Sequence, residues 1–152
     1  MVTLDQNITN IEEGFYRSML GEAHQHIVAG ILLRLGFYVT TSPIRTGAYD
    51  IIIVAFTDRT NDPHNTVLLR AQCKTIKNSL RFVGGLRGGT DRIYIRPSPK
   101  EYKYTEKHND LIIGTDSVTL DMYIYPTRFI DIWGNSVSKK KIQALRIILK
   151  SC

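Results

Sequence analysis

Two segments of the sequence carry polar residues where a buried strand would bring them together. Asp50 precedes an apolar run at 51–56, and Gln72 and Lys74 lie in a second strand-like run twenty-two residues later. Because side chains alternate along a strand, Gln72 and Lys74 share one face and Cys73 occupies the other. If the two strands pair, Asp50, Gln72 and Lys74 converge on one side of a sheet. A carboxylate, an amide and an ammonium group gathered in this way could bind charged groups and help to transfer protons.

A helix near the N-terminus supplies a fourth polar group. Apolar residues recur every four positions between Ile27 and Leu35, which predicts a helix that begins by Glu12 or by Gly21 and ends at Leu35. Glu22 then lies near the N-terminus of this helix and can reach the same edge of the sheet.

The other predicted elements complete one mixed α/β domain that spans residues 1–152. We expect strands at 37–41, 49–56, 66–75, 111–114 and 120–125, a hairpin of 79–83 with 92–96, and helices at 100–107, 129–133 and 139–149. A chain of 152 residues is long enough for one domain with its own core. The order of a helix, several strands and then more helices predicts a central sheet flanked by helices.

The charge is concentrated in one part of the chain. The net charge is +6, but residues 70–107 alone hold ten basic and three acidic residues and therefore carry +7. A concentrated basic region indicates an anionic partner, and nucleic acid is the commonest one. The alternative is a basic surface that only keeps the protein soluble.

Composition excludes several classes of protein. Hydrophobic residues make up 43% of the chain, and no apolar run approaches the roughly 20 residues that span a bilayer. The N-terminus lacks the pattern of a signal peptide, so we expect a soluble, cytoplasmic protein. Two cysteines form no disulfide framework; Cys73 is predicted to lie in the core.

Other catalytic motifs are absent from the sequence. The glycine-rich segment at 84–89 lacks the Lys and Ser or Thr of a phosphate-binding loop, and no GxSxG nucleophile motif occurs. The histidines form no zinc-binding or His-Asn-His nuclease spacing and are expected on the surface; they are His24, His26, His64 and His108.

The polar residues described first resemble the motif of the PD-(D/E)XK nuclease superfamily. Its pattern is a Glu on a helix, an Asp that opens one strand, and a carboxylate-x-Lys on the next strand. The matching positions are Glu22, Asp50, Gln72 and Lys74. The segment at 107–130 looks like the later strand pair of the branch that contains small homing endonucleases encoded in bacterial tRNA introns. The resemblance covers about residues 21–129, and some members of that branch also carry Gln in the carboxylate position.

The resemblance implies a restriction-endonuclease-like core and a magnesium site. Asp50 would be the bridging ligand, Gln72 a neutral ligand, and Cys73 would contribute its backbone carbonyl oxygen. Glu22 would bind through water or hold a second metal ion, and Lys74 would position or activate the attacking water. An amide oxygen attracts Mg²⁺ less strongly than a carboxylate. Tyr49 stands where the family has Pro, a residue that shapes a turn.

The implied function is Mg²⁺-dependent, site-specific cleavage of double-stranded DNA. The basic region at about 77–107 would be an insertion that contacts DNA, with arginines reading bases and lysines contacting phosphates. The candidates are Lys77, Arg81, Arg87, Arg92, Arg96, Lys100, Lys103 and Lys107. Cutting both strands needs two active sites, so a homodimer or homotetramer is expected.

Four other functions stay open at this point. A restriction endonuclease or a Holliday-junction resolvase would share the same core. A DNA-binding protein without catalysis would explain Gln72, and an oligomerisation domain would make the basic region accidental.

Overall fold

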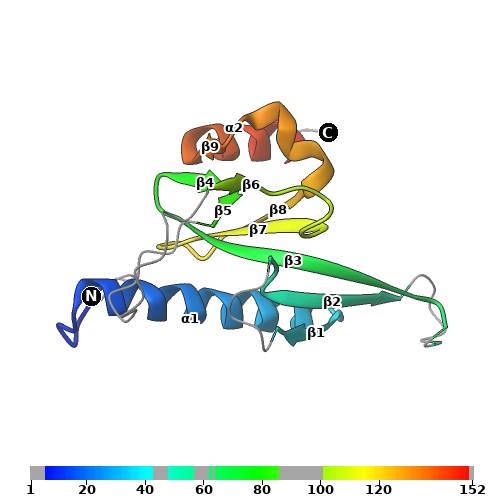
Figure 1. The fold of residues 1–152 in the computed structure, drawn as a ribbon, viewed down its shortest axis with the longest axis horizontal. Coiled ribbons are helices and arrows are strands. Elements are labelled where there is room, and N and C mark those ends of the chain that lie inside the picture. Colours follow the sequence, from blue (N-terminus) through cyan, green and yellow to red (C-terminus); the bar gives the residue numbers. More distant parts are fainter. Residues whose placement is uncertain (1–5, 43–47, 57–61, 63, 86–100, 151–152) are drawn as a thin grey trace.

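The computed structural model describes residues 6–42, 48–56, 62, 64–85 and 101–150, with side chains up to residue 144. A five-stranded mixed sheet runs through the molecule in the order β1-β2-β3-β7-β8. Its strands are β1 (Tyr38–Thr41), β2 (Ile51–Phe56), β3 (Thr66–Ile76), β7 (Leu111–Asp116) and β8 (Met122–Pro126). Only the pair formed by β3 and β7 is parallel. Figure 1 shows α1 against one side of the sheet and α2 on the other.

The long helix α1 (Glu13–Arg34) follows the predicted span. The side chain of Glu12 caps its N-terminus by accepting hydrogen bonds from the backbone N–H groups of Gly14 and Phe15. At the other end, Gly36 has a φ of +91°, a conformation that ends helices and favours glycine. Of the two predicted starting points, the earlier one is therefore confirmed.

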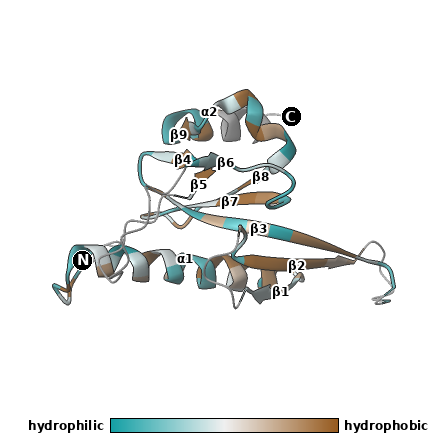
Figure 2. Cartoon of the chain, in the orientation of Figure 1, coloured by the Kyte–Doolittle hydropathy of each residue, from teal (hydrophilic) through white to brown (hydrophobic). Residues whose placement is uncertain are grey.

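One hydrophobic core lies between α1 and the sheet. Alternate residues of β2 and β3 point towards the helix, as their sequence pattern predicts. The buried members of this core are Val28, Leu32, Ile51, Ile53, Ala71, Cys73 and Ile113. Figure 2 shows the hydrophobic residues concentrated along β2 and β7. The predicted burial of Cys73 is confirmed, since 9% of the residue is exposed.

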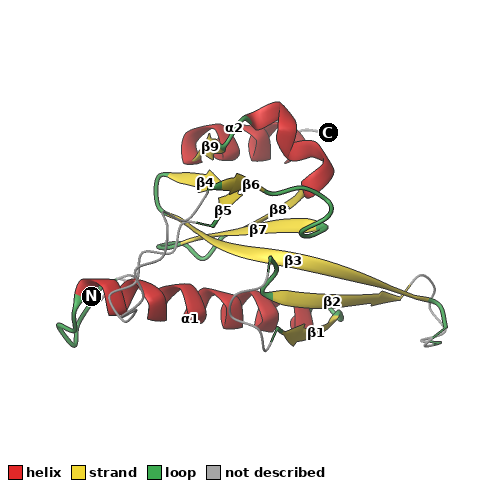
Figure 3. Cartoon of the chain, viewed as in Figure 1, coloured by secondary structure: helices red, strands yellow, loops and turns green. Residues whose placement is uncertain are grey.

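A second core covers the opposite face of the sheet. It is built around the residues Ile76, Leu80, Phe82, Tyr104, Ile112, Ile130, Val137 and Ile142. The covering elements are β4 (Ser79–Arg81), β5 (Val83–Gly84), β6 (Tyr102–Lys103), the 3₁₀ helix η1 (Thr127–Trp133), β9 (Ser136–Ser138) and α2 (Lys139–Lys150). Figure 3 shows these short strands stacked between the sheet and α2.

Two local predictions are corrected in this second layer. Strand β4 pairs with β9, and β5 pairs with β6, so 79–83 does not form a simple hairpin arm; residues 92–96 lie outside the described residues. The predicted helix at 100–107 is wrong, because Tyr102–Lys103 form a strand and a turn follows. The physical reason is burial: Phe82 and Tyr104 are both buried, and the backbone N–H of Tyr104 donates to the carbonyl oxygen of Phe82, so the two segments pack side by side on the core.

None of the helices in the described part of the chain is long and apolar enough to cross a membrane.

Candidate active site

Asp50 lies at the point where β2 enters the sheet. Its backbone N–H donates to the carbonyl oxygen of Ala71 (2.9 Å), and its own carbonyl oxygen accepts from the N–H of Ser42 (2.7 Å). These bonds extend the strand ladder by one residue and fix the backbone of Asp50 between β1 and β3. The carboxylate turns towards β3, where its Oδ2 accepts a hydrogen bond from the backbone N–H of Cys73 at 2.8 Å. The carboxylate is thus held by backbone geometry.

The Gln72 side chain lies between two oxygen atoms of the site. Its Nε2 group donates to Oδ2 of Asp50 and also approaches the carbonyl oxygen of Cys73 at 3.3 Å. Only 7% of Gln72 is exposed. A carboxylate and a carbonyl can accept but not donate, so the amide must present its nitrogen, not its oxygen, to them. The amide nitrogen therefore occupies a point where two oxygen ligands converge.

Lys74 lies on the same face of β3 as Gln72 but points towards the second core. Its Nζ donates to the carbonyl oxygen of Val83 at 3.3 Å and lies 5.1 Å from the centre of the Tyr104 ring. That distance is within the range of a cation–π interaction. The ammonium group is thus held by β5 and by the residue that follows β6.

Glu22 lies in the middle of α1 and not near its N-terminus, because the helix begins nine residues earlier, at Glu13. Its side chain is 49% exposed, and its Oε1 lies 3.8 Å from Nε2 of His26, one helical turn away. The prediction that Glu22 lies near the beginning of the helix is therefore wrong. Glu22 nevertheless lines the same cavity as Asp50.

The four motif residues all line one cavity of about 670 Å³. It lies between the first half of α1 and the adjoining ends of β1, β2 and β3. Its wall includes all four motif residues, Glu22, Asp50, Gln72 and Lys74, together with Arg17, Ser18, Gly21, His24, Gln25, Thr41, Ser42, Cys73 and Thr75. The cavity is therefore lined largely by polar groups.

The oxygen atoms of this cavity fit a hard cation, although few of them carry a negative charge. The convergence of Asp50 Oδ2 and the Cys73 carbonyl on the Gln72 nitrogen marks a point that a cation could occupy, and a rotated Gln72 amide would add its oxygen. Hard divalent ions favour such oxygen ligands. Among the described residues, no three His, Cys, Asp or Glu side chains lie close enough together to hold a metal ion.

The Cys73 thiol is not part of this donor set. Burial, and secondarily the charge of Asp50, raise the pKa of the thiol far above its usual value. The thiol therefore stays protonated and packs in the core with α1. The backbone of Cys73 faces the site instead: its N–H donates to Asp50, and its carbonyl oxygen accepts from Gln72.

The predicted DNA-contacting residues fall into three groups. Lys77 and Lys107 are exposed. Arg81 and Lys103 form ion pairs, with Glu101 and Asp131 respectively, each at 3.1 Å, which reduces their net positive field. The remaining candidates lie outside the described residues; they are Arg87, Arg92, Arg96 and Lys100.

Sequence reasoning missed His24, which was expected on the surface. Only 3% of His24 is exposed, and its Nδ1 shares a hydrogen bond of 2.6 Å with the hydroxyl of Thr75. Desolvation lowers its pKa, and the charge of Asp116 opposes this shift only in part. The missed signal is a period of four: His24 continues the buried stripe of Val28 and Leu32.

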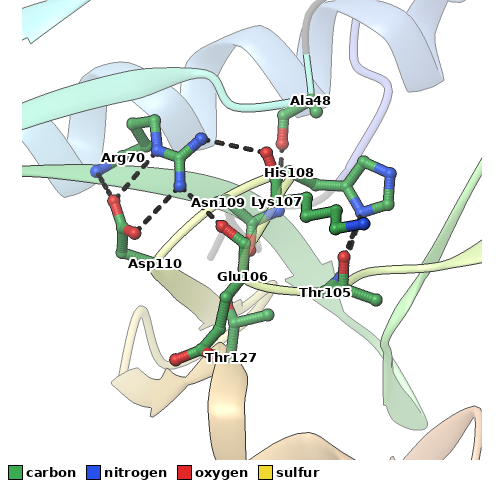
Figure 4. Close-up of polar contacts among 9 residues, drawn as sticks. All are labelled: Ala48, Arg70, Thr105, Glu106, Lys107, His108, Asn109, Asp110 and Thr127. Atoms are coloured by element: carbon green, nitrogen blue, oxygen red, sulfur yellow. Dashed lines mark hydrogen bonds and ion pairs between the residues drawn. The ribbon is translucent and has the colours of Figure 1, made fainter.

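A polar network behind the cavity supports the strand that carries the motif (Figure 4). The guanidinium of Arg70 pairs with Asp110 and donates to the carbonyl oxygens of Glu106 and Lys107. This network binds the turn that precedes β7 to β3, two residues before Gln72.

Asn109 connects the same turn to the approach of Asp50. It is fully buried, and its Nδ2 donates to the carbonyl oxygen of Ala48 at 3.0 Å. The hydroxyl of Thr127 donates to its Oδ1 at 2.6 Å. Because Ala48 is only two residues before Asp50, this buried amide helps to fix the segment from which Asp50 enters the sheet (Figure 4).

Comparisons with known proteins identify the fold. No protein-family model matches the chain, and no curated protein matches it in sequence. Among solved structures, the chain is similar to a bacterial homing endonuclease, I-Ssp6803I, with a TM-score of 0.58 and 15% sequence identity. The similarity covers 88% of this chain and 93% of that one. The predicted mixed α/β fold is confirmed: the chain has a nuclease-like fold, with a mixed central sheet flanked by helices, that matches a homing endonuclease.

Proposed function

We propose that this protein is a Mg²⁺-dependent, site-specific endonuclease of the homing type that hydrolyses phosphodiester bonds in double-stranded DNA. The observation that carries the proposal is the convergence of the Asp50 carboxylate and the Cys73 carbonyl on one point. That point lies in a cavity that Lys74 also lines. The similarity of the fold to a bacterial homing endonuclease and the PD-(D/E)XK-like order of the residues support the same function.

Each motif residue has a role in this proposal. Asp50, the oxygen of a rotated Gln72 amide and the Cys73 carbonyl would hold the cation. Bound Mg²⁺ would neutralise charge on the scissile phosphate and lower the pKa of a water. Lys74 would orient or activate that water and offset the charge that develops on the phosphate. Glu22, from α1, would accept a hydrogen bond from a water molecule or hold a second cation.

A homodimer or homotetramer is part of the proposal, because one chain carries one candidate site and a double-strand break requires two. Restriction and junction-resolving endonucleases would use the same groups and differ in their substrate.

One observation favours a second function, DNA binding without cleavage. The Gln72 amide already satisfies Asp50 and the Cys73 carbonyl within the protein. A site whose oxygen atoms already accept hydrogen bonds from the protein attracts a metal ion less strongly than a site with two carboxylates.

A cleavage assay separates these functions. Wild type and Lys74→Ala would be incubated, with Mg²⁺ or with EDTA, on supercoiled plasmid, a synthetic four-way junction and a library of genomic fragments. Arg34→Ala is the charge-matched control, because Arg34 is exposed in the last turn of α1. We expect Mg²⁺-dependent cutting that Lys74→Ala reduces by a factor of about 10²–10⁴ and Arg34→Ala preserves.

The other outcomes identify the other functions. Preferential cutting of the junction would indicate a resolvase. Retardation of DNA without any cutting, with or without Mg²⁺, would contradict the endonuclease proposal and support a DNA-binding protein.

A further inference from the structure

The ammonium group of Lys74 is held by groups outside the PD-(D/E)XK-like motif. The carbonyl oxygen of Val83, in β5, accepts its hydrogen bond at 3.3 Å. The ring of Tyr104, the residue after β6, lies 5.1 Å from Nζ. A lysine side chain has four rotatable bonds, so its charged end keeps one position only where neighbouring groups restrict it. The hydrogen bond to Val83 and the ring of Tyr104 contribute to that restriction.

Tyr104 is itself fixed from several directions. Only 4% of the residue is exposed, and its backbone N–H donates to the carbonyl oxygen of Phe82 at 2.9 Å. Its ring meets the ring of Tyr102 edge-on at 5.6 Å. Gly84 leaves the space that the ring fills: a Cβ atom at that position would lie 2.7 Å from the Tyr104 hydroxyl oxygen.

The turn that follows Tyr104 is anchored to the strand that carries Lys74. The backbone N–H of Thr105 donates to Nδ1 of His108 at 3.0 Å, which closes the turn. The Arg70 guanidinium donates to the Glu106 and Lys107 carbonyl oxygens at 2.7 and 3.0 Å. Figure 4 shows this turn tied through Arg70 to β3, the strand in which Lys74 also lies. The position of Tyr104 relative to Lys74 is thus set from both sides.

We propose that Tyr104 is a positioning residue for the reaction, which holds the ammonium group of Lys74 through the face of its ring. This inference rests on the proposed endonuclease function. The electron-rich face of the ring attracts the charged ammonium and restricts its rotation. The proposal assigns this role to the ring of Tyr104 and not to its hydroxyl group.

The substitutions that test this role separate the ring from the hydroxyl and from general packing. Tyr104→Phe keeps the ring, and Tyr104→Leu removes it. Tyr125→Leu is the matched control, because Tyr125 packs against Phe82 in the same core and has no described contact with Lys74. Gly84→Ala is a second route, since its methyl group must displace the Tyr104 ring without removing it.

Two measurements report on Lys74. The first is the rate at which limiting acetic anhydride acetylates Lys74 in the folded protein, measured by mass spectrometry, with unfolding followed by circular dichroism. The second is the single-turnover rate of cutting of a plasmid that carries a fragment cleaved by the wild type, at saturating protein. DNA affinity is measured separately by gel retardation in Ca²⁺.

We expect Tyr104→Leu and Gly84→Ala to acetylate Lys74 several-fold faster and to cut about tenfold more slowly, with unchanged DNA affinity. Tyr104→Phe and Tyr125→Leu should match the wild type in both measurements per folded molecule. Equal losses in Tyr104→Phe and Tyr104→Leu, or wild-type acetylation of Lys74 in a folded Tyr104→Leu or Gly84→Ala, would overturn the proposal.

The acetylation measurement does not depend on catalysis, so the two proposals can fail separately. If the wild type cuts no DNA, the endonuclease function fails, while altered acetylation still shows that Tyr104 positions Lys74.

Discussion

At the scale of single residues, the site depends on whether Gln72 presents the nitrogen or the oxygen of its side-chain amide. Its nitrogen lies between Asp50 and the Cys73 carbonyl. These two oxygen atoms would also attract a cation placed at the same point. An amide is neutral and can rotate, so the same side chain can donate to Asp50 or offer its oxygen to a cation. The neutral residue in the motif therefore stabilises the site when no cation is present, which a second carboxylate could not do.

Gln72→Glu should make the stability of the protein depend on metal. Without a cation, two carboxylates would face each other and the Cys73 carbonyl would lose its donor, so we expect the free energy of unfolding to fall by about 1–3 kcal/mol. Mg²⁺ should restore much of that loss. Thermal unfolding at increasing Mg²⁺ concentration, compared with the wild type and with Asp50→Asn, checks this. An identical response to Mg²⁺ in Gln72→Glu and the wild type would contradict it.

His24 should make stability depend on pH near neutrality. Its pKa is lowered in the folded protein, first by burial, so the unfolded chain binds a proton more readily than the folded one. The contribution of neutral His24 to the free energy of unfolding is fully present above the pKa of histidine in the unfolded chain, about 6.5. It decreases as pH falls from there towards the folded pKa, with a slope of at most about 1.4 kcal/mol per pH unit. Urea unfolding of wild type and His24→Gln between pH 8 and 5 checks this. Parallel pH profiles would show that another group is responsible.

At the scale of elements, specific residues fix the two ends of α1, whereas one position in its interior is poorly suited to a helix. Glu12 caps its beginning and Gly36 ends it in a left-handed conformation. Gly30 lies inside the helix, is exposed, and has no atom within 4 Å of the place where a Cβ atom would be. The helix therefore contains a glycine that neither packing nor backbone geometry requires.

Gly30→Ala and Gly36→Ala should change stability in opposite directions. Alanine at position 30 should stabilise the protein by roughly 0.5–1 kcal/mol, because glycine is a poor residue for a helix interior. Alanine at position 36 should destabilise it by about 1 kcal/mol, because φ is positive there. Urea unfolding measures both, and DNA cutting should not change with Gly30→Ala. Destabilisation by Gly30→Ala would mean that this face of α1 contacts something else.

At the scale of the whole molecule, the sheet carries two cores, one on each face, and the candidate cavity lies beside the first and reaches the second through Lys74. The basic residues are not equivalent on this framework. Lys77 is exposed and has no described ion pair among the residues that the structure covers. Arg81 is paired with Glu101 at 3.1 Å, so a DNA phosphate would have to compete with that carboxylate.

Lys77→Ala and Arg81→Ala should therefore differ in the salt dependence of DNA binding. Removing one cation that neutralises a phosphate should reduce the slope of log affinity against log salt concentration by about one. We expect that full change for Lys77→Ala and a smaller change for Arg81→Ala. Glu101→Gln should strengthen binding, since it frees Arg81. Gel retardation of a plasmid fragment at several salt concentrations measures these slopes. An equal slope for the wild type and Lys77→Ala would exclude Lys77 from the DNA interface.

The sequence by itself determined the elements whose pattern is local. The period of four predicted the helix that ends at Leu35, and the alternation of β3 predicted that Cys73 is buried while Gln72 and Lys74 share the other face. The strand pair β7 and β8 was also predicted. These patterns are local because a helix or a strand repeats within a few residues. The same alternation predicted that Asp50, Gln72 and Lys74 lie near one another.

Only the tertiary structure decided the contacts between segments that lie far apart in the chain. Strand β4 pairs with β9, more than fifty residues later, and the ring of Tyr104 lies over Lys74. His24 is buried where α1 packs against β3, and it meets Thr75 there. No local pattern encodes such contacts, since each depends on how whole elements pack to bury apolar surface. The proximity of Asp50, Gln72 and Lys74 could therefore be predicted from the sequence, while the residues that hold them in place could not.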